Sequence, residues 1–537
     1  MRYFETRGPV YPEDSYIVSR EQEINDFIKR VRNGRYIVLF APRQTGKTTF
    51  FKSVLESLTD KKLTYFPIQL DFQVCRNTTT AVFYERFHKM IIEKVEMVFQ
   101  NYHNTIPDKV RQFLDTSILT DDYSMIEFLK QLRIHLNNPK IVLIIDEFDA
   151  IPDSAVSDFL YALRQIYNFG KNRSLYSVGI VGVKNITQLN YDRSVSPFNI
   201  QDEFLLPNFT LEQVQELFSQ YTDETGQNIS ADVIEGIHKQ TAGQPFLVNR
   251  FGQILTEEFN IPKTETIEHN HFIKALAQLL EEDNVNLSHL VTNVRRDKRF
   301  ESYLMQIVSY DMGVRFTLRN ETISELATYG VITKGEDGMC EILNPIYHYC
   351  ILQTFKPLVN GLENEYLPEN NTNGFQDYLT SNGEIDMLLL LNNFRDFIIR
   401  AGFRVLQVPE TPKEYVGQHL LLAYLDQFVL LIGGVMYLEV PTGRGRMDIV
   451  IYHNNRTYII ETKIWDGENT YAAGKKQLVR YMKSEGQTTG YYVVFDHRKN
   501  PEPRLETDTI QEATIHSYVI PVIQDPPSTE HNAAINF

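Results

Sequence analysis

The stretch Gly34–Phe51, GRYIVLFAPRQTGKTTFF, decides the first part of the fold. Its pattern predicts a buried strand over Tyr36–Phe40, a tight loop, and a helix that begins at Lys47. A G-x-x-x-x-G-K-[ST] pattern in this context binds phosphate, because loop amides and the helix N-terminus converge on phosphate oxygens. Ala41 replaces the first glycine of the pattern, so the loop entry must avoid a backbone conformation that only glycine adopts.

The loop predicts a site for ATP and Mg²⁺. Lys47 is expected to reach the β- and γ-phosphates, and the Thr48 hydroxyl is expected to ligate Mg²⁺. The alternative is a strand–helix connection that contains GKTT by chance. The predicted ATP-binding residues of the loop are Arg43, Gln44, Thr45, Gly46, Lys47, Thr48 and Thr49.

A second strand carries acidic residues at its end. The run of β-branched and leucine residues in Lys140–Asp149, KIVLIIDEFD, predicts a strand buried on both faces of a parallel sheet. Open α/β sheets hold their ligands at the carboxyl edge. We therefore expect Asp146 to bind the Mg²⁺ shell and Glu147 to orient or deprotonate the attacking water.

Other residues are predicted around the nucleotide. Asn185 follows the next predicted strand, Tyr176–Val183, and is expected beside the γ-phosphate. From Pro207 the pattern is helical, and Pro245 is expected to place a rigid turn near the nucleotide. Arg164 and Arg193 are candidate arginine fingers, although a surface arginine is the favoured interpretation of each. A helix capped by Ser19 is predicted to precede the first strand.

Composition limits the class of protein. The 537 residues suffice for about three domains. The net charge of −16 argues against coating of nucleic acid by the whole surface, whereas a local basic groove stays compatible. Three widely spaced cysteines predict reduced structural residues, with no disulfide framework or zinc site, in a cytoplasmic protein. No signal peptide and no membrane span are expected.

Residues 1–260 resemble the AAA-like ATPases allied to the archaeal-type and STAND P-loop families. The resemblance is carried by APRQTGKTT, IIDEFD, SPFNI (Ser196–Ile200) and TAGQPFLVNR. It implies ATP binding and hydrolysis coupled to a conformational switch. The expected α/β fold is a P-loop NTPase core over residues 1–206 followed by a helical lid over 207–290.

A middle module is predicted over residues 291–356. Two helices and a two-stranded hairpin turning at Glu336-Asp337-Gly338 have the outline of a winged helix. Its second helix, Ile323–Tyr329, carries little positive charge, which favours packing on the ATPase over DNA binding. Residues 357–383 are rich in Pro, Asn and Gly and predict a linker.

The C-terminal part contains a hairpin with opposed carboxylates. Two alternating apolar runs flank Asn454-Asn455, which predicts a two-residue turn. With that turn, residues whose numbers sum to 909 face each other, as do Asp448 and Glu461. Opposed residues share a face with Cβ atoms about 5 Å apart. Lys463 lies two residues beyond Glu461 and belongs to the same face.

Two opposed carboxylates repel each other unless a cation lies between them. We therefore expect Asp448, Glu461 and the Thr462 carbonyl to hold Mg²⁺ or Mn²⁺. Such a metal lowers the pKa of a bound water and polarises a phosphate, and Lys463 would position that water. The alternative is a cross-strand acid–lysine pair on a solvated face.

Residues 385–500 resemble the PD-(D/E)XK nuclease superfamily, with the pattern D448…E461-T-K463. The resemblance implies a restriction-endonuclease-like α/β domain, predicted over 384–520, before a flexible tail over 521–537. It also implies roles for Gln477 and Tyr481, and for Glu414 as the upstream acid, a role for which Glu439 competes. Local positive charge for phosphates would come from Arg444, Arg446, Lys475, Lys476 and Arg480.

Together these features predict an ATP-regulated, metal-dependent nuclease, with DNA favoured over RNA. Fusions of this kind suggest defence against phage or mobile elements, which is an analogy. The main alternative is a STAND-like signalling switch that oligomerises on a protein trigger and uses the nuclease fold only to bind nucleic acid. A helicase-like translocase lacks support, since no second motor domain is found.

Overall fold

The computed structural model describes residues 2–8, 10–41, 44–58, 63–101, 105–182, 201–282, 284–295, 297–309, 314–354, 376–405, 413–439, 447–498 and 500–522. The chain forms two compact units. Unit 1 comprises residues 1–220 and 244–249, and unit 2 comprises residues 221–243 and 250–537. The segment predicted as a lid, 207–290, is therefore divided between them. In the described part of the chain, no helix is both long and apolar enough to cross a membrane.

Unit 1 is built on a parallel sheet with the strand order β2-β3-β4-β1-β5. The predicted phosphate-loop strand and the predicted acidic-end strand are confirmed as β1 and β3. The central strands are buried on both faces because apolar residues fill them without alternation. The strands are β1 (Tyr36–Phe40), β2 (Tyr65–Asp71), β3 (Lys140–Asp146), β4 (Leu175–Gly182) and β5 (Gln201–Glu203).

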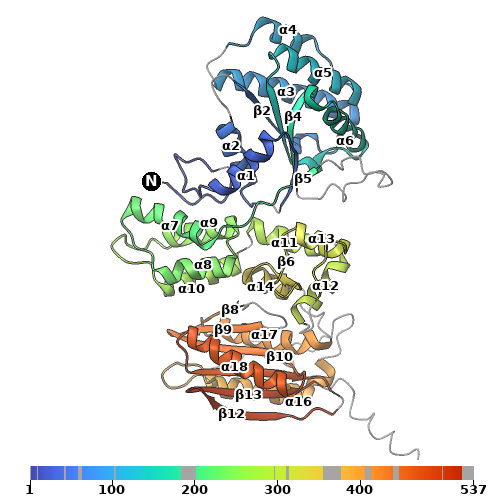
Figure 1. Cartoon of the computed structure of the whole chain (residues 1–537). Helices are drawn as coiled ribbons and strands as arrows, with labels where there is room; N and C mark the ends of the chain where they lie inside the picture. The colour runs from blue at the N-terminus through green and yellow to red at the C-terminus, as the bar shows by residue number, and fades with distance from the viewer. Residues whose placement is uncertain are drawn as a thin grey trace, which may run out of the picture. The chain divides into compact units, whose positions relative to one another are not determined.

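Helices cover both faces of this sheet (Figure 1). On one face lie α1 (Glu21–Arg32) and α2 (Lys47–Leu58), and α2 begins at the predicted residue. The predicted cap of α1 is wrong, because Arg20 is the N-cap and the Ser19 amide donates to Glu216. The other face is covered by α3 (Thr80–Asn101), α4 (Asp108–Thr116), α5 (Asp122–His135) and α6 (Asp153–Asn168).

Two helices continue from unit 1 into unit 2, namely α7 (Leu211–Thr225) and α9 (Pro245–Gln253). The predicted order of two helices and a hairpin is confirmed by α12 (Lys298–Ser309), α13 (Glu321–Thr328), β6 (Ile332–Lys334) and β7 (Cys340–Ile342). The remaining helices of this part are α8 (Ala231–Thr241), α10 (His269–Glu281), α11 (Val285–Arg295) and α14 (Pro345–Thr354), with a π-helical turn at Ile254–Glu258.

The C-terminal part of unit 2 is a mixed sheet with the strand order β12-β13-β11-β10-β9-β8. The helix α18 (Glu468–Ser484) lies on one face of this sheet (Figure 1), and its apolar residues pack there. Contacts on the sheet are also made by α16 (Met387–Val405) and α17 (Lys413–Leu431). The strands are β8 (Val435–Glu439), β9 (Met447–His453), β10 (Arg456–Ile464), β11 (Thr489–Asp496), β12 (Arg504–Ile510) and β13 (Ala513–Pro521).

The boundaries of this part differ from the prediction. Residues 376–383, predicted as linker, belong to the C-terminal fold: Tyr378 contacts Phe428, and the Gly383 carbonyl accepts a hydrogen bond from His453. At the other end β13 extends to Pro521, and the Val522 amide donates to the Asp496 carbonyl. The predicted linker residues 357–375 and tail residues 523–537 lie outside the described part.

His348 on α14 gives a pH-dependent stability. It is buried, and neither ring nitrogen has a hydrogen-bond partner in the structure. Burial lowers the pKa of the imidazole from 6.5 to about 4. Protonation therefore favours the unfolded chain, so stability present above pH 6.5 is lost as the pH falls through about 4. Between these two pH values the free energy of unfolding falls by about 3 kcal/mol.

We expect His348→Phe to remove most of this acid sensitivity. The measurement is urea unfolding at pH 7, 5 and 4, followed by the emission of Trp465, which is the only tryptophan. The half-exposed His269 provides the control, since His269→Phe should leave the pH dependence as in wild type. Equal acid sensitivity of wild type and His348→Phe would contradict the prediction.

Candidate nucleotide and metal sites

The phosphate loop and the acidic end of β3 lie side by side. The Thr48 hydroxyl donates to Asp146 Oδ2 over 3.2 Å, and the buried Lys47 ammonium donates to the Ala41 carbonyl over 2.9 Å. Burial raises the pKa of Asp146, an effect that the Glu147 amide and the Lys47 charge oppose. This set of oxygen donors fits Mg²⁺, which takes hydroxyl and carboxylate ligands.

One acidic residue near this site was missed by the sequence analysis. Asp71 ends β2 and is paired with Asp146 at the carboxyl edge of the sheet. Its negative charge adds to the rise in the pKa of Asp146. The signal was present in the sequence, because Asp71 ends the largely apolar stretch Leu63–Phe72 much as Asp146 ends the apolar run of β3.

The backbone of the phosphate loop is left-handed at two positions. Gln44 and Gly46 have φ values of 59° and 81°. A left-handed conformation is readily adopted by glycine, and no atom lies within 4 Å of the position of a Cβ at Gly46. Thr49 accepts a hydrogen bond from the Val10 amide, which ties the N-terminal segment to the start of α2.

The predicted turn at Pro245 does lie beside the loop. Gln244 Nε2 donates to the Gln44 carbonyl over 3.3 Å. Ala242 and Gly243 have positive φ values of 46° and 67°, so the chain turns sharply between α8 and α9. Pro245 and Asn249 then line a cavity together with Gln44 and Gly46.

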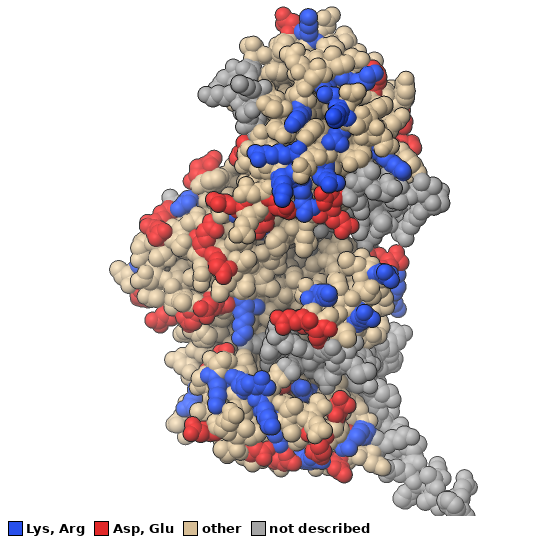
Figure 2. Space-filling model, viewed as in Figure 1, with Lys and Arg blue, Asp and Glu red and all other residues tan. Residues whose placement is uncertain are grey.

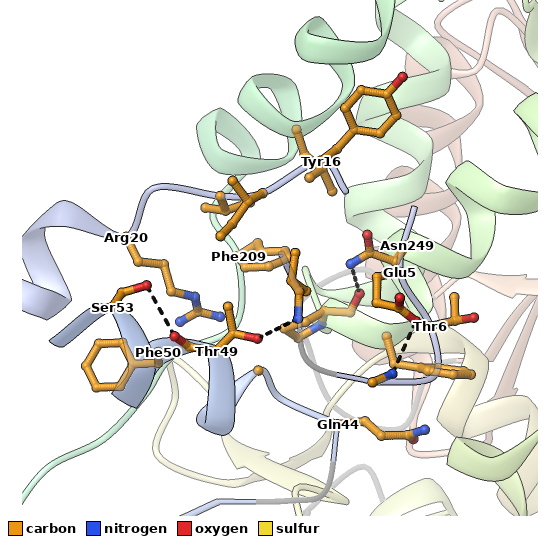
Figure 3. Close-up of a pocket in the computed structure, with 18 of the residues that line it drawn as sticks. Glu5, Thr6, Tyr16, Arg20, Gln44, Thr49, Phe50, Ser53, Phe209 and Asn249 are labelled. Atoms are coloured by element: carbon orange, nitrogen blue, oxygen red, sulfur yellow. Dashed lines mark hydrogen bonds between the residues drawn. The ribbon is translucent and has the colours of Figure 1, made fainter. Parts of the chain in front are cut away.

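This cavity has a volume of about 220 Å³ and lies within unit 1 (Figure 3). Its walls come from the N-terminal segment, the phosphate loop, α2, the residues before α7, and the start of α9. Most of the lining surface is apolar, and polar side chains such as Glu5, Arg20 and Asn249 supply the rest, which is typical of a site for an organic ligand. Its labelled residues include Glu5, Tyr16, Arg20, Thr49, Phe50 and Phe209.

Arg20 is a second residue that the sequence analysis missed. Its side chain is buried in the cavity wall, donates to the Pro207 carbonyl over 2.8 Å and lies 4.7 Å above the Phe209 ring. Burial lowers the pKa of the guanidinium to about 10. No sequence pattern marks this residue, because its burial depends on the packing of Phe209, nearly two hundred residues later in the sequence.

In the C-terminal sheet, the predicted hairpin register is confirmed. Asp448 is paired with Glu461, and the turn residues Asn454 and Asn455 have φ values of 48° and 60°. β8 adds a third position, because Glu439 is paired with Asp448. Glu439, Asp448 and Glu461 thus occupy one row across three neighbouring strands, which we name the acidic row.

The acidic row bears on the choice between Glu414 and Glu439 as the upstream acid. Glu414 lies on α17, and Gly417 of that helix packs on Phe495 of β11. Val494, next to Phe495, packs instead with α18 on the opposite face of the sheet. Glu461 shares the α18 face with Ile459, two residues before it. The backbone therefore favours Glu439, at the end of β8, over Glu414.

Glu461 and Lys463 are both buried, with 1% and 7% of their surface exposed. Gln477 and Tyr481 lie half-buried on α18, and Tyr481 packs on the same apolar cluster as Ile459. Thr462, the third predicted metal ligand, is fully buried on β10. A buried carboxylate requires a compensating charge or hydrogen bonds, and a divalent cation with oxygen ligands supplies the former.

The predicted role of Lys475 in phosphate binding is wrong. Its ammonium donates to Glu506 and Asp508, each over 2.6 Å, and its side chain is 9% exposed. Lys476 and Arg480 are exposed on α18. The following predicted residues lie outside the described residues: Arg43, Asn185, Arg193, Arg444 and Arg446. The side chains of Glu414, Glu439 and Asp448 are likewise not described.

Comparisons with known proteins divide the chain in two. Residues 6–349 match the AAA-like domain family, and residues 386–499 match a domain of unknown function, DUF8371. No curated protein matches the chain.

Solved structures align with part of the chain. The Walker-type ATPase of Pyrococcus abyssi is 17% identical with a TM-score of 0.45, and the alignment covers 65% of this chain and 99% of that one. The Orc1 protein of Aeropyrum pernix, solved in complex with DNA, is 15% identical with a TM-score of 0.32, over 63% of this chain and 93% of that one. Since the family match spans more than half of its residues, the chain belongs to the AAA-like domain family of P-loop ATPases.

Proposed function

We propose that this protein is an ATP-controlled, metal-dependent nuclease with DNA as its preferred substrate. The observation that carries the proposal is the acidic row, in which Glu439, Asp448 and Glu461 are paired across three strands. Neighbouring strands lie about 4.8 Å apart, so unscreened carboxylates in such a row repel one another. A divalent cation held by carboxylate oxygens removes this repulsion.

Each residue of this site has a proposed task. Glu439, Asp448, Glu461 and the Thr462 carbonyl would hold the cation. When bound, the cation supplies a nucleophilic water and stabilises charge on the scissile phosphate. Lys463, on the face of Glu461, orients that water, and Gln477 and Tyr481 on α18 border the substrate.

Tasks in unit 1 follow from the contacts of the phosphate loop. Lys47 binds the β- and γ-phosphates, Thr48 and Asp146 hold Mg²⁺, and Glu147 activates water. The apolar cavity beside Gln44 and Pro245 takes the adenosine end of ATP.

Control by ATP is supported by one short segment of the chain. Gln240, at the end of α8, is buried and donates through Nε2 to the Leu438 carbonyl over 3.2 Å. Leu438 directly precedes Glu439 of the acidic row. Lys239 pairs with Glu485 over 3.6 Å and lies 5.5 Å from the Tyr481 ring. Four residues after Gln240, Gln244 contacts the phosphate loop, so the same segment touches both candidate sites.

The winged-helix-like module predicted over residues 291–356 has a proposed packing role. Its last helix, α14, is joined to α17 by two hydrogen bonds: the Tyr349 hydroxyl donates to Asp426 over 3.0 Å, and Gln353 donates to Asp426 over 3.3 Å. These contacts support a packing role in preference to a DNA-reading role. They join two helices of unit 2, whereas the sequence analysis favoured packing on the ATPase.

We expect Gln240→Met to uncouple cleavage from ATP. Methionine keeps the length of the side chain but cannot donate a hydrogen bond to the Leu438 carbonyl. A movement of α8 is then no longer transmitted to β8 through this bond. Coupling energies of about 1–3 kcal/mol correspond to about 5- to 150-fold effects. The ratio of cleavage rates with and without ATP should become about one, with ATP hydrolysis retained. In the control, Glu235→Met puts methionine on the exposed side of α8 and should keep the wild-type ratio. A wild-type ratio in Gln240→Met would refute this route.

The proposed function is tested by cleavage of linear and circular DNA with Mg²⁺ or Mn²⁺, with and without ATP. Cleavage that requires a divalent cation and responds to ATP is the expected result. An intact ATPase without cleavage in any condition would leave the AAA-like ATPase established and overturn the nuclease.

A further inference from the structure

The amino ends of four parallel strands in unit 1 meet at one edge of the sheet, opposite the edge that carries Asp146 and the phosphate loop. The sheet order β2-β3-β4-β1 brings together residues that are far apart in the sequence. Lys140 begins β3, Arg173 precedes β4, and Arg35 precedes β1. We name the cations of this edge the basic edge: Arg32, Arg35, Arg133, Lys140, Lys171 and Arg173.

The basic edge stands out in a chain whose net charge is −16. Lys and Arg side chains gather on the face of unit 1 turned to the viewer (Figure 2). Arg32, Arg35 and Lys171 are exposed. Asp202 offsets part of the charge, with Oδ1 2.5 Å from Arg30 and Oδ2 4.0 Å from Arg35.

The inner cations are held by groups that do not neutralise them. Arg173 donates to the Gly34 carbonyl over 2.7 Å, and Arg133 donates to the Asn172 and Arg173 carbonyls over 3.2 and 3.1 Å. The Lys140 ammonium lies 5.0 and 4.7 Å from the rings of Tyr65 and Tyr176. Carbonyl and ring contacts fix these side chains in place and preserve their positive charge.

We propose that the basic edge binds the phosphate backbone of duplex DNA without reading its sequence. Two strand spacings of about 4.8 Å separate the ends of β3, β4 and β1 that carry Lys140, Arg173 and Arg35, so these backbone positions span about 10 Å. A duplex presents one charge per about 1.7 Å of its axis. The aromatic faces are already occupied by Lys140 and Arg173, so base stacking is not available there. The surface adds a DNA-holding site to the proposed nuclease, and its test requires no cleavage.

The test measures binding of a fluorescein-labelled 30-base-pair duplex by anisotropy, with EDTA present and salt varied from 50 to 200 mM. The full-length variant Arg32→Gln/Arg35→Gln/Lys171→Gln removes the three exposed cations and spares those that hold backbone carbonyls. Each phosphate contact adds about 0.9 to the slope of log K against log salt. We expect the slope to become shallower by about 2 to 3 and binding at 100 mM salt to weaken at least 30-fold, that is by about 2 kcal/mol or more.

Matched controls make the result specific. Lys52→Gln/Lys89→Gln/Arg111→Gln removes the same charge from α2, α3 and α4 of unit 1 and should bind DNA as wild type does. Unchanged ATP hydrolysis in both triple variants establishes that unit 1 is folded. Because EDTA removes divalent cations, the binding measured here does not depend on a metal held by the acidic row, which separates this surface from the nuclease site.

Three outcomes would overturn the proposal. The first is wild-type affinity and salt slope in the basic-edge variant. The second is an equal loss of binding in the control variant, which would show that DNA binding depends on the net charge of the protein and not on the basic edge. The third is displacement of the duplex by polyglutamate or by single-stranded RNA as readily as by unlabelled duplex, which would assign the surface to another anionic partner.

Discussion

Replacement of Glu461 by Gln is expected to lower metal-dependent DNA cleavage by at least about 10³-fold, or about 4 kcal/mol of activation free energy. The substitution is nearly isosteric and removes one charge from the acidic row. Glu461 is 1% exposed and directly opposite Asp448. Bulk water therefore does not reach the position of its carboxylate to replace the missing ligand oxygen. A cation that stabilises a developing phosphate charge contributes several kcal/mol, and this contribution falls with its occupancy.

The measurement is the initial rate of cleavage of linear DNA at saturating Mg²⁺ or Mn²⁺. ATP hydrolysis should stay within about twofold of wild type, because Glu461 and the phosphate loop belong to different units. Glu502→Gln is the matched control, since Glu502 is exposed and outside the row. Cleavage by Glu461→Gln at the wild-type rate would exclude the acidic row as the catalytic site. Loss of cleavage in both variants would point to a general effect on the C-terminal fold.

Replacement of Lys47 by Ala is expected to lower ATP hydrolysis by about 10²- to 10³-fold, the range typical for loss of one donor to a developing oxyanion. Lys47 is buried and its ammonium already lies at the loop entry, 2.9 Å from the Ala41 carbonyl. Its charge also opposes the rise in the pKa of Asp146. Removal of Lys47 should therefore weaken both phosphate binding and the ionised state of the proposed Mg²⁺ ligand.

Phosphate release at saturating Mg·ATP measures this effect. Lys52→Ala is the control on the same helix, because the Lys52 ammonium lies 4.2 Å from the Tyr11 ring. DNA cleavage by Lys47→Ala should persist but lose its response to ATP. Hydrolysis at the wild-type rate would contradict the assignment of the loop. Loss of the ATP response in Lys52→Ala as well would contradict the specificity of the Lys47 effect.

Local pattern was sufficient for the elements that carry the candidate sites. A run of apolar residues followed by GKTT predicts β1 and α2 because both the strand and the helix start depend on neighbouring residues. The Asn454-Asn455 turn sets the register of its two strands, so the pairing of Asp448 with Glu461 follows from the residues between them. The predicted cap of α1 was wrong because Arg20 is held by Pro207 and Phe209. These residues lie far away in the sequence, so a local pattern does not include them.

The sequence by itself thus determined the phosphate loop, the acidic end of β3 and the opposed carboxylates of the hairpin. Only the tertiary structure decided that Glu439 completes the acidic row and that Gln240 binds the Leu438 carbonyl directly before it. It also decided that Lys475 forms ion pairs with Glu506 and Asp508. It also assembled the basic edge from strand ends more than a hundred residues apart. The physical reason is that side-chain periodicity is a local property, whereas sheet order and burial depend on which distant surfaces exclude water together.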